Sequence, residues 1–383
     1  EGTFGAADTI DVTENRIGGD AMTLVSDRED DTVEVSSLEE AAESEELARR
    51  GEATHDQRMT PNGMAWWFAY LFGNISTKGS GPYTHTICPF PKTFCTEEAL
   101  NTDTSLLVDD NVSFPASGTL MLDTGLTLAY SALPDAQTIT VDATHATIAV
   151  GDAIRLVPEE VLFAIPSMTV LEEVSEGSTQ REFSGVVVSE ASVSIEKKGF
   201  AQISATLLGN GTVTWEADAA RPTLLTESYL KASGTTVNYG GTWDGDAYGS
   251  GTVIDANIVN FNWNANNNIE GDEGYLFNGG LVRGRAERSR LSQTVSMQIE
   301  LTGATPDYQA AQIAGTVFAF RTYLVGTGSF TVEIVFPALQ ILSSNISGGT
   351  GNLVQDLECI VLEHSTHGSV EVTVVNSVTG YLT

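Results

Sequence analysis

Histidines and carboxylates are the side chains best suited to catalytic or metal chemistry, and in this sequence the histidines are scattered. His364 and His367 lie three residues apart beside Glu363, a spacing that a metal-binding pair can have. The residues around them read as a strand, which would place the two imidazoles on opposite faces. We therefore expect surface histidines. No nucleophile elbow, phosphate loop or dinucleotide motif occurs, so we predict no enzyme activity, no catalytic residue and no cofactor.

One asparagine-rich run has the spacing of a calcium loop. Its members fall at the ligand positions of an EF-hand-like segment: Asn262, Asn264, Asn266, Asn268, Glu270 and Glu273. Asn267 stands where the sharp turn of such a loop requires glycine, and neutral amides bind calcium weakly. The run Asp244-Gly245-Asp246 is an equally weak signal. The sequence favours a polar loop and predicts no metal site.

Three cysteines are present, Cys88, Cys95 and Cys359. An odd number cannot form a closed disulfide framework, and the spacing matches no zinc knuckle. Cys88 and Cys95 could pair with each other or both be free. We expect unreactive thiols.

A group of arginines forms the only basic cluster of the chain: Arg283, Arg285, Arg288 and Arg290. Arginine pairs carboxylates in a bidentate geometry, so the cluster is a candidate for contact with an acidic neighbouring subunit. The acidic stretch 27–46 supplies candidate partners for it, Glu39, Glu40 and Glu43 among them. A solvated basic face is the alternative, and the sequence leaves both open.

The charge of the chain excludes some partners. Acidic residues outnumber basic residues 51 to 18 over 383 residues, for a formal net charge of −33. Recognition of phosphates needs a surplus of Lys and Arg, so neither free nucleic acid nor an anionic membrane surface is expected as a partner. The scarcity of lysine suits a halophilic host, although a merely acidic protein has the same composition. No apolar run reaches the roughly 18 residues of a membrane span, and the first residues show no signal pattern.

Short strand patterns dominate the rest of the chain. Residues 61–72 predict a buried helix that begins with Pro61 and ends at Gly73. A second helix is predicted over 305–318, and residues 226–250 read as a linker or long loop. Residues 102–160 carry short strand runs separated by turn residues and predict a small separate β unit. The strands form two β-rich blocks with one helix each, which indicates an internal duplication. Exposed strand edges and one dominant sign of charge favour assembly with other chains.

Several runs together resemble the major tail tube proteins of long-tailed, siphovirus-like viruses of bacteria or archaea. The runs are 61–73 (PNGMAWWFAYLFG), 83–87 (YTHTI), 166–170 (PSMTV), 183–195 (FSGVVVSEASVSI) and 330–337 (FTVEIVFP). Residues 112–123 and 149–154 resemble a small β module inserted in many phage structural proteins. The resemblance implies a mainly β fold with two tail-tube β-sandwich or barrel-forming domains, each with one packed helix. The first would comprise residues 1–101 and 161–224, the inserted module 102–160, and the second 225–383.

The same resemblance implies a structural role in the virion tail tube. Subunits would form trimeric, pseudo-sixfold rings that stack around a channel for genome ejection. The partners would be other copies of the chain, further tail proteins at the tube ends and viral DNA in non-specific passage, with no membrane. An acidic cell-surface adhesin or surface-layer module with weak calcium sites is the alternative.

Overall fold

The protein is described from a computed structural model. It covers residues 21–30, 44–111, 113–142, 145–157, 165–175, 179–216, 228–269, 275, 280–284, 286, 288–302, 307–348 and 353–381. The predicted mainly β fold is confirmed, since strands account for 57% of the described residues, which include two short α-helices. The interface candidates Arg285, Glu39, Glu40 and Glu43 lie outside the described residues, as do Glu270 and Glu273.

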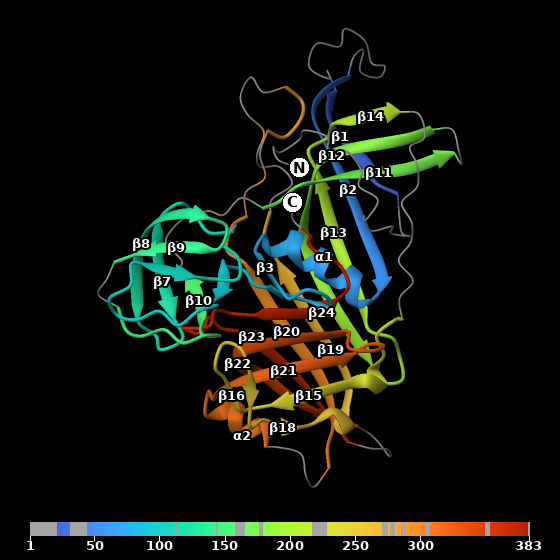
Figure 1. Ribbon diagram of the computed structural model, residues 1–383. Helices are drawn as coiled ribbons and strands as arrows, with labels where there is room; N and C mark the ends of the chain where they lie inside the picture. The colour runs from blue at the N-terminus through green and yellow to red at the C-terminus, as the bar shows by residue number, and fades with distance from the viewer. Residues whose placement is uncertain are drawn as a thin grey trace.

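One large antiparallel sheet organises the molecule (Figure 1). Its strands follow one another in this order: β1 (Thr23–Asp30), β2 (Ser44–Arg58), β13 (Gln202–Gly209), β12 (Thr179–Glu196), β19 (Ile258–Asn266), β20 (Ser292–Glu300), β23 (Val354–Val361), β22 (Thr331–Ser347), β21 (Val317–Val325), β15 (Thr235–Tyr239) and β18 (Thr252–Val253). Five strands join it off this path: β3 (Ile75–Lys78), β4 (Tyr83–Ile87), β11 (Met168–Ser175), β14 (Val213–Glu216) and β24 (Glu371–Asn376). Each strand of the path runs antiparallel to its neighbours.

The two longest strands, β12 and β22, each change partners along their length. The first part of β12 pairs with β11 and β14, and its second part pairs with β13 and β19. In the same way, β22 pairs first with β21 and β24 and later with β23. A β-bulge follows closely after the change in both strands, between Val188 and Glu190 in β12 and between Ile341 and Ser343 in β22. A bulge bends a strand and increases its twist, so one strand can pair with neighbours in two different layers of the sheet.

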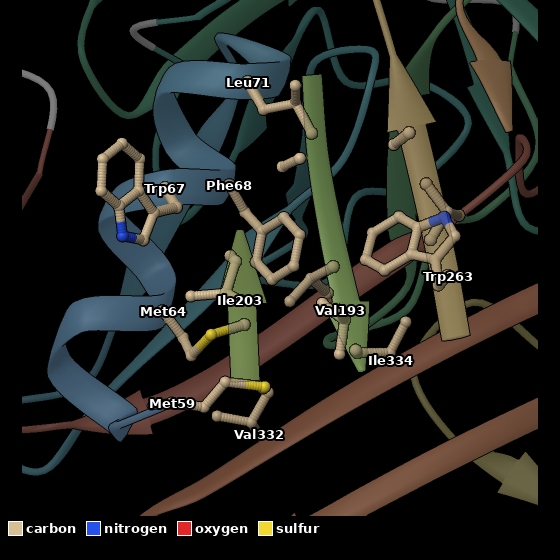
Figure 2. Packing of buried hydrophobic residues seen from close by; sticks show 14 of the residues in the cluster. Met59, Met64, Trp67, Phe68, Leu71, Val193, Ile203, Trp263, Val332 and Ile334 are labelled. Atoms are coloured by element: carbon tan, nitrogen blue, oxygen red, sulfur yellow. The ribbon is translucent and has the colours of Figure 1, made fainter. Parts of the chain in front are cut away.

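Helix α1 (Pro61–Phe72) confirms the predicted buried helix. The Thr60 hydroxyl accepts a hydrogen bond from the Gly63 amide at 3.1 Å, and Pro61 occupies the first turn, where no donor is needed. Gly73 ends the helix at φ 78°, a conformation that favours glycine. The helix is buried on nearly every side because it packs against the core face of the sheet, where Phe68 stacks on Trp263 with ring centroids 5.1 Å apart (Figure 2).

Helix α2 (Tyr308–Ile313) is much shorter than the predicted helix over 305–318. The Asp307 carboxylate caps it by accepting from the Ala310 amide at 2.9 Å. The prediction was wrong at the C-terminal end because Val317 already begins β21 and pairs with Gln340 of β22. Val and Phe side chains fit a pleated sheet better than a helix, and residues from Val317 onward form a strand. None of the described helices is both long and apolar enough to cross a membrane.

A second sheet of six strands has a hydrophobic core of its own. Its order is β5 (Lys92–Phe94), β10 (Ala153–Leu156), β7 (Gly118–Leu122), β8 (Thr127–Asp135), β9 (Thr138–Val141) and β6 (Ser105–Leu107). It curls into the half-barrel at the side of the main sheet in Figure 1. The strands lie where the sequence predicts a small β unit, but the sheet already begins at Lys92, ahead of the expected start at residue 102.

The half-barrel is joined to the large sheet by buried polar contacts. Lys92 Nζ forms an ion pair with Glu371 of β24 and donates to the Gly245 carbonyl. Arg155 donates to the Ser365 carbonyl at 3.0 Å. Burial raises the pKa of the Glu371 carboxyl, and the Lys92 ammonium opposes that rise. The segment around Gly245 was predicted as part of a linker, but it contains β15 and a small hairpin of β16 (Thr242–Trp243) and β17 (Tyr248–Gly249). Two single-turn 3₁₀ helices, Ala232–Gly234 and Asp255–Asn257, flank these strands.

Candidate functional site

The large sheet has one apolar face and one polar face. On β19 the side chains of Phe261, Trp263 and Ala265 are buried, while the asparagines between them point the other way. Side chains alternate between the two faces of a strand, so this pattern follows directly from the sequence. The apolar face holds the core and α1, and the opposite face is left open.

The polar face is continuous across six neighbouring strands, from β2 to β23. The register aligns one row of side chains from strand to strand: Asp56, Ser204, Ser192, Asn264, Thr294 and Ile360. Each of the first five is polar, and each is at least partly open to solvent. Hydroxyl and amide side chains therefore cover most of this face, and we call it the polar face below.

The charge on the polar face is negative. Its carboxylates are Glu52, Asp56, Glu190, Glu196, Glu300, Asp356 and Glu358. On β2 the basic residues in step with Asp56 are Arg58 and Arg50, and Arg50 forms an ion pair with Glu52 at 2.5 Å. Lys197 reaches it from the turn after β12 and binds Glu300 at 2.7 Å. An excess of fixed carboxylates repels phosphate groups that approach this face.

Amide and hydroxyl groups hold several of these carboxylates in place. Glu190 accepts hydrogen bonds from the amides of Asn264 and Asn266, the latter at 3.0 Å. Asp356 accepts from Gln298 at 2.8 Å and from the Ser347 hydroxyl at 2.9 Å. Such lateral contacts leave fewer polar groups free to bind a passing ligand.

The first members of the asparagine-rich run lie on this face and not in a loop. Asn262, Asn264 and Asn266 lie within β19, so the prediction of a polar loop was wrong for them. Asn267 is fully buried, and its amide donates to the carbonyls of Leu71 and Val188. No group of three or more His, Cys, Asp or Glu side chains that could hold a metal occurs among the residues the structure describes.

The arginine cluster lies largely inside the chain. The Arg283 side chain is 2% exposed, and Arg288 is 7% exposed with a hydrogen bond of 3.0 Å to the Pro89 carbonyl. Burial lowers the pKa of the Arg288 guanidinium. Arg290 is exposed. An inter-subunit role for the set Arg283, Arg285, Arg288, Arg290, Glu39, Glu40 and Glu43 stays a prediction, and among its described members only Arg290 is accessible to a partner.

The two histidines that resemble a metal pair lie together instead of on opposite faces. Their rings stack with centroids 4.8 Å apart, because His364 and His367 belong to a tight turn and not to a strand. The His364 Nδ1 atom accepts from the backbone amides of Thr366 and His367. Burial and the charges of His364, Lys92 and Arg155 lower the pKa of His367 to about 4. A neutral, stacked pair of this kind stabilises a turn.

All three cysteines are free and buried. Burial raises the pKa of Cys88 and of Cys359 to about 12, and it also raises the pKa of Cys95. The thiolate is the reactive form, so we expect these thiols to be unreactive at neutral pH. Cys88 and Cys95 do not pair, and the lack of reactivity stays a prediction that burial supports.

We therefore expect the native protein to resist alkylation at pH 8. Iodoacetamide should modify none of the three cysteines within an hour, and mass spectrometry of the protein in guanidinium chloride should find all three modified. Rapid modification of the native chain would show that a thiol is accessible and ionised.

Comparison with protein families gives one match, to the phage tail tube protein family over residues 12–361. Among curated proteins none matches the chain. The family match covers most of the large sheet, the half-barrel and both helices. The chain therefore belongs to the phage tail tube protein family and is a non-enzymatic structural subunit of the virion tail.

Proposed function

We propose that the polar face lines the channel of the tail tube and that the viral genome passes along it. The observation that carries this proposal is the continuity of the face over six strands of the sheet, opposite the hydrophobic core. DNA binds surfaces that neutralise its phosphates. A face of carboxylates, hydroxyls and amides offers no such neutralisation, so DNA slides along it without being retained.

We also propose that each chain contributes two similar units to a ring. The sheet order β1-β2-β13-β12 is followed by β19-β20-β23-β22. In both sets a hairpin precedes a helix, and a long bulged strand and a shorter return strand follow it. Three copies would give six such units, which supports a trimeric ring of pseudo-sixfold symmetry. Rings of this kind would stack into the tube of a siphovirus-like tail and serve genome ejection.

The proposed division of the chain places residues 1–101 and 161–224 in the first unit and residues 225–383 in the second. The half-barrel would be an insertion in the first unit. Its separate core supports this division, and β5 supports moving its start from residue 102 to Lys92. A halophilic host remains a proposal that rests on the net charge of −33.

Electron microscopy of the purified chain tests the proposed function. We expect rings or hollow stacked tubes with a central channel. An acidic adhesin with calcium sites would give separate particles without a channel, and that outcome would contradict the proposal.

The charge of the channel gives a second prediction. The Asn262→Lys/Thr294→Lys variant places two ammonium groups on the polar face, so its tubes should retain duplex DNA at 50 mM salt, whereas parent tubes should not. Retention should fall steeply with salt, since it depends on displaced counterions. A filter-binding assay on assembled tubes measures the difference.

The matched control carries the same charges on the half-barrel, as Thr124→Lys/Val150→Lys. Both of its sites are exposed, and neither lies on the polar face. Duplex DNA should reach the lysines of this control only from outside the tube, so nuclease should remove it. DNA held in the channel of the first variant should be protected from nuclease. Nuclease-sensitive binding in both variants would refute the assignment of the polar face to the channel.

A further inference from the structure

Exposed apolar side chains lie on α2 and along the end of β22, the strand that α2 contacts. Ile313 is 83% exposed, Leu342 57% and Ile346 55%. The Gln312 side chain on α2 donates to the Leu342 carbonyl at 2.9 Å, so the helix and this part of the strand are in direct contact. Apolar side chains grouped in this way on a surface indicate an interaction site. We call these three residues the α2–β22 patch.

The counterpart of this patch in the first half of the chain is covered. Counted from the bulge, Ile346 lies three residues after Ser343, and Val193 lies three residues after Glu190. Val193 is fully buried in the core, where α1 lies over it and β19, paired along β12 from Glu190 to Glu196, sets Trp263 beside it. Figure 2 places Val193 between α1 and Trp263.

One edge of β22 has no neighbouring strand after Gln340 among the described residues. This edge corresponds to the edge of β12 that pairs with β19. Strand β21 pairs with β22 only as far as Gln340, and no strand follows it on that side in the part of the chain described. Ile346 is exposed where Val193 is buried, and no described strand stands beside it in the place of β19.

We propose that a second copy of this chain covers the α2–β22 patch with the β1–β2 side of its own sheet. This inference rests on the proposed tube function and specifies which surfaces join two copies. In the sheet order, β1 and β2 precede β13 and β12 of the first half. In the same way, β19 and β20 precede β23 and β22 of the second half. Within one copy, β19 pairs antiparallel with β12 and with β20. Strand β1 is likewise antiparallel to β2, so β1 of a second copy has the direction needed to pair antiparallel with β22. The second half of one copy is thus joined to the first half of the next.

The opposite end of the sheet has an open edge to receive this contact. Strand β1 pairs with β2 only between Ser44 and Glu52, so residues 53–58 of β2 have no strand on that side within the described ranges. The polar face also continues onto β22, where Ser343 and Ser347 donate to Glu358 and Asp356. A second copy seated here extends the polar face without interruption. A contact between unlike ends closes into a ring when the rotation permits.

Charge placed in the patch tests the inference. Because both residues are exposed, the Leu342→Asp/Ile346→Asp variant should fold with the circular dichroism spectrum and urea midpoint of the parent. It should sediment as a monomer and form no rings, because the buried contact would hold unpaired carboxylates. The matched control, Leu126→Asp/Val150→Asp, changes two equally exposed residues of the half-barrel and should assemble as the parent does.

The outcomes separate the two proposals. Assembly of the patch variant at parental yield would overturn the docking site and leave the tube function standing. A parent that forms neither rings nor tubes would overturn the tube function, and the proposed contact with it.

Thiol labelling gives a second measurement that does not depend on loss of assembly. Ile346→Cys should react with a maleimide in monomers and be protected at least tenfold in assembled rings. Val150→Cys should react equally in both states, and the native thiols are buried and silent. Equal labelling of Ile346→Cys in monomers and rings would exclude a second copy from the patch.

Discussion

Replacement of Trp263 by alanine is expected to lower the free energy of unfolding by about 3–5 kcal/mol, the usual loss for a large buried aromatic side chain. Trp263 is 1% exposed and joins α1 to two strands of the sheet. Its ring lies 5.1 Å from Phe68 and 5.3 Å from Phe336, centroid to centroid. Its indole N–H donates to Gln293 at 3.2 Å. Alanine would leave a cavity and an amide without its donor.

Urea denaturation of the monomer measures this loss, and Trp215→Ala is the control. Trp215 is 63% exposed, so its removal should change stability by no more than about 0.5 kcal/mol. Trp263→Phe should fall between the two, because it keeps the ring contacts and loses the indole N–H. A Trp263→Ala midpoint equal to that of Trp215→Ala would mean that α1 does not depend on this contact.

The Lys92–Glu371 ion pair gives the second large effect. Both side chains are almost completely buried between the half-barrel and the large sheet, and Lys92 Nζ also lies 4.8 Å from the ring centroid of Phe94. Removing one partner of a buried pair typically costs about 3–5 kcal/mol, because the other charge stays buried without compensation. Lys92→Met should therefore destabilise the protein by about that amount at pH 8.

The effect of Lys92→Met should shrink as the pH falls. Burial already raises the pKa of Glu371 in the parent, and loss of the ammonium raises it further. A carboxyl whose pKa is higher in the folded than in the unfolded state binds protons more readily when folded. Stability is therefore regained as the pH drops through the folded pKa towards the unfolded value.

Urea titrations of Lys92→Met at pH 8 and pH 5 check this dependence. The double variant Lys92→Met/Glu371→Leu serves as control, since it removes both charges and should regain most of the stability at either pH. A Lys92→Met penalty that is the same at both pH values would show that Glu371 stays ionised without its partner.

The sequence predicts best those elements whose pattern is local. Helix α1 carries its own start and stop in Thr60, Pro61 and Gly73 and is apolar nearly all round. The alternation of Phe261, Trp263 and Ala265 with asparagines marks β19 in the same way, although the same asparagines also have the spacing of a calcium loop. The half-barrel is visible as short strand runs between turns.

Elements fixed by distant partners could not be predicted in the same way. Strand β2 (Ser44–Arg58) is rich in charge and has no core run, and it is a strand because β1 and β13 pair with it. The burial of Arg283 depends on segments far away in sequence, and its backbone amide donates to the Asn210 carbonyl. The polar face itself is spread over six strands and appears only when their register is known.

The partner change along β12 has a mechanical consequence. Residues up to Val186 are bonded to β11 and β14, and residues from Val187 onward to β13 and β19, so one covalent strand crosses from one layer into the other. A pull along β12 loads the hydrogen bonds of both layers together in shear. The layers of one copy therefore resist sliding apart, and a tail that flexes should yield first at the joints between copies.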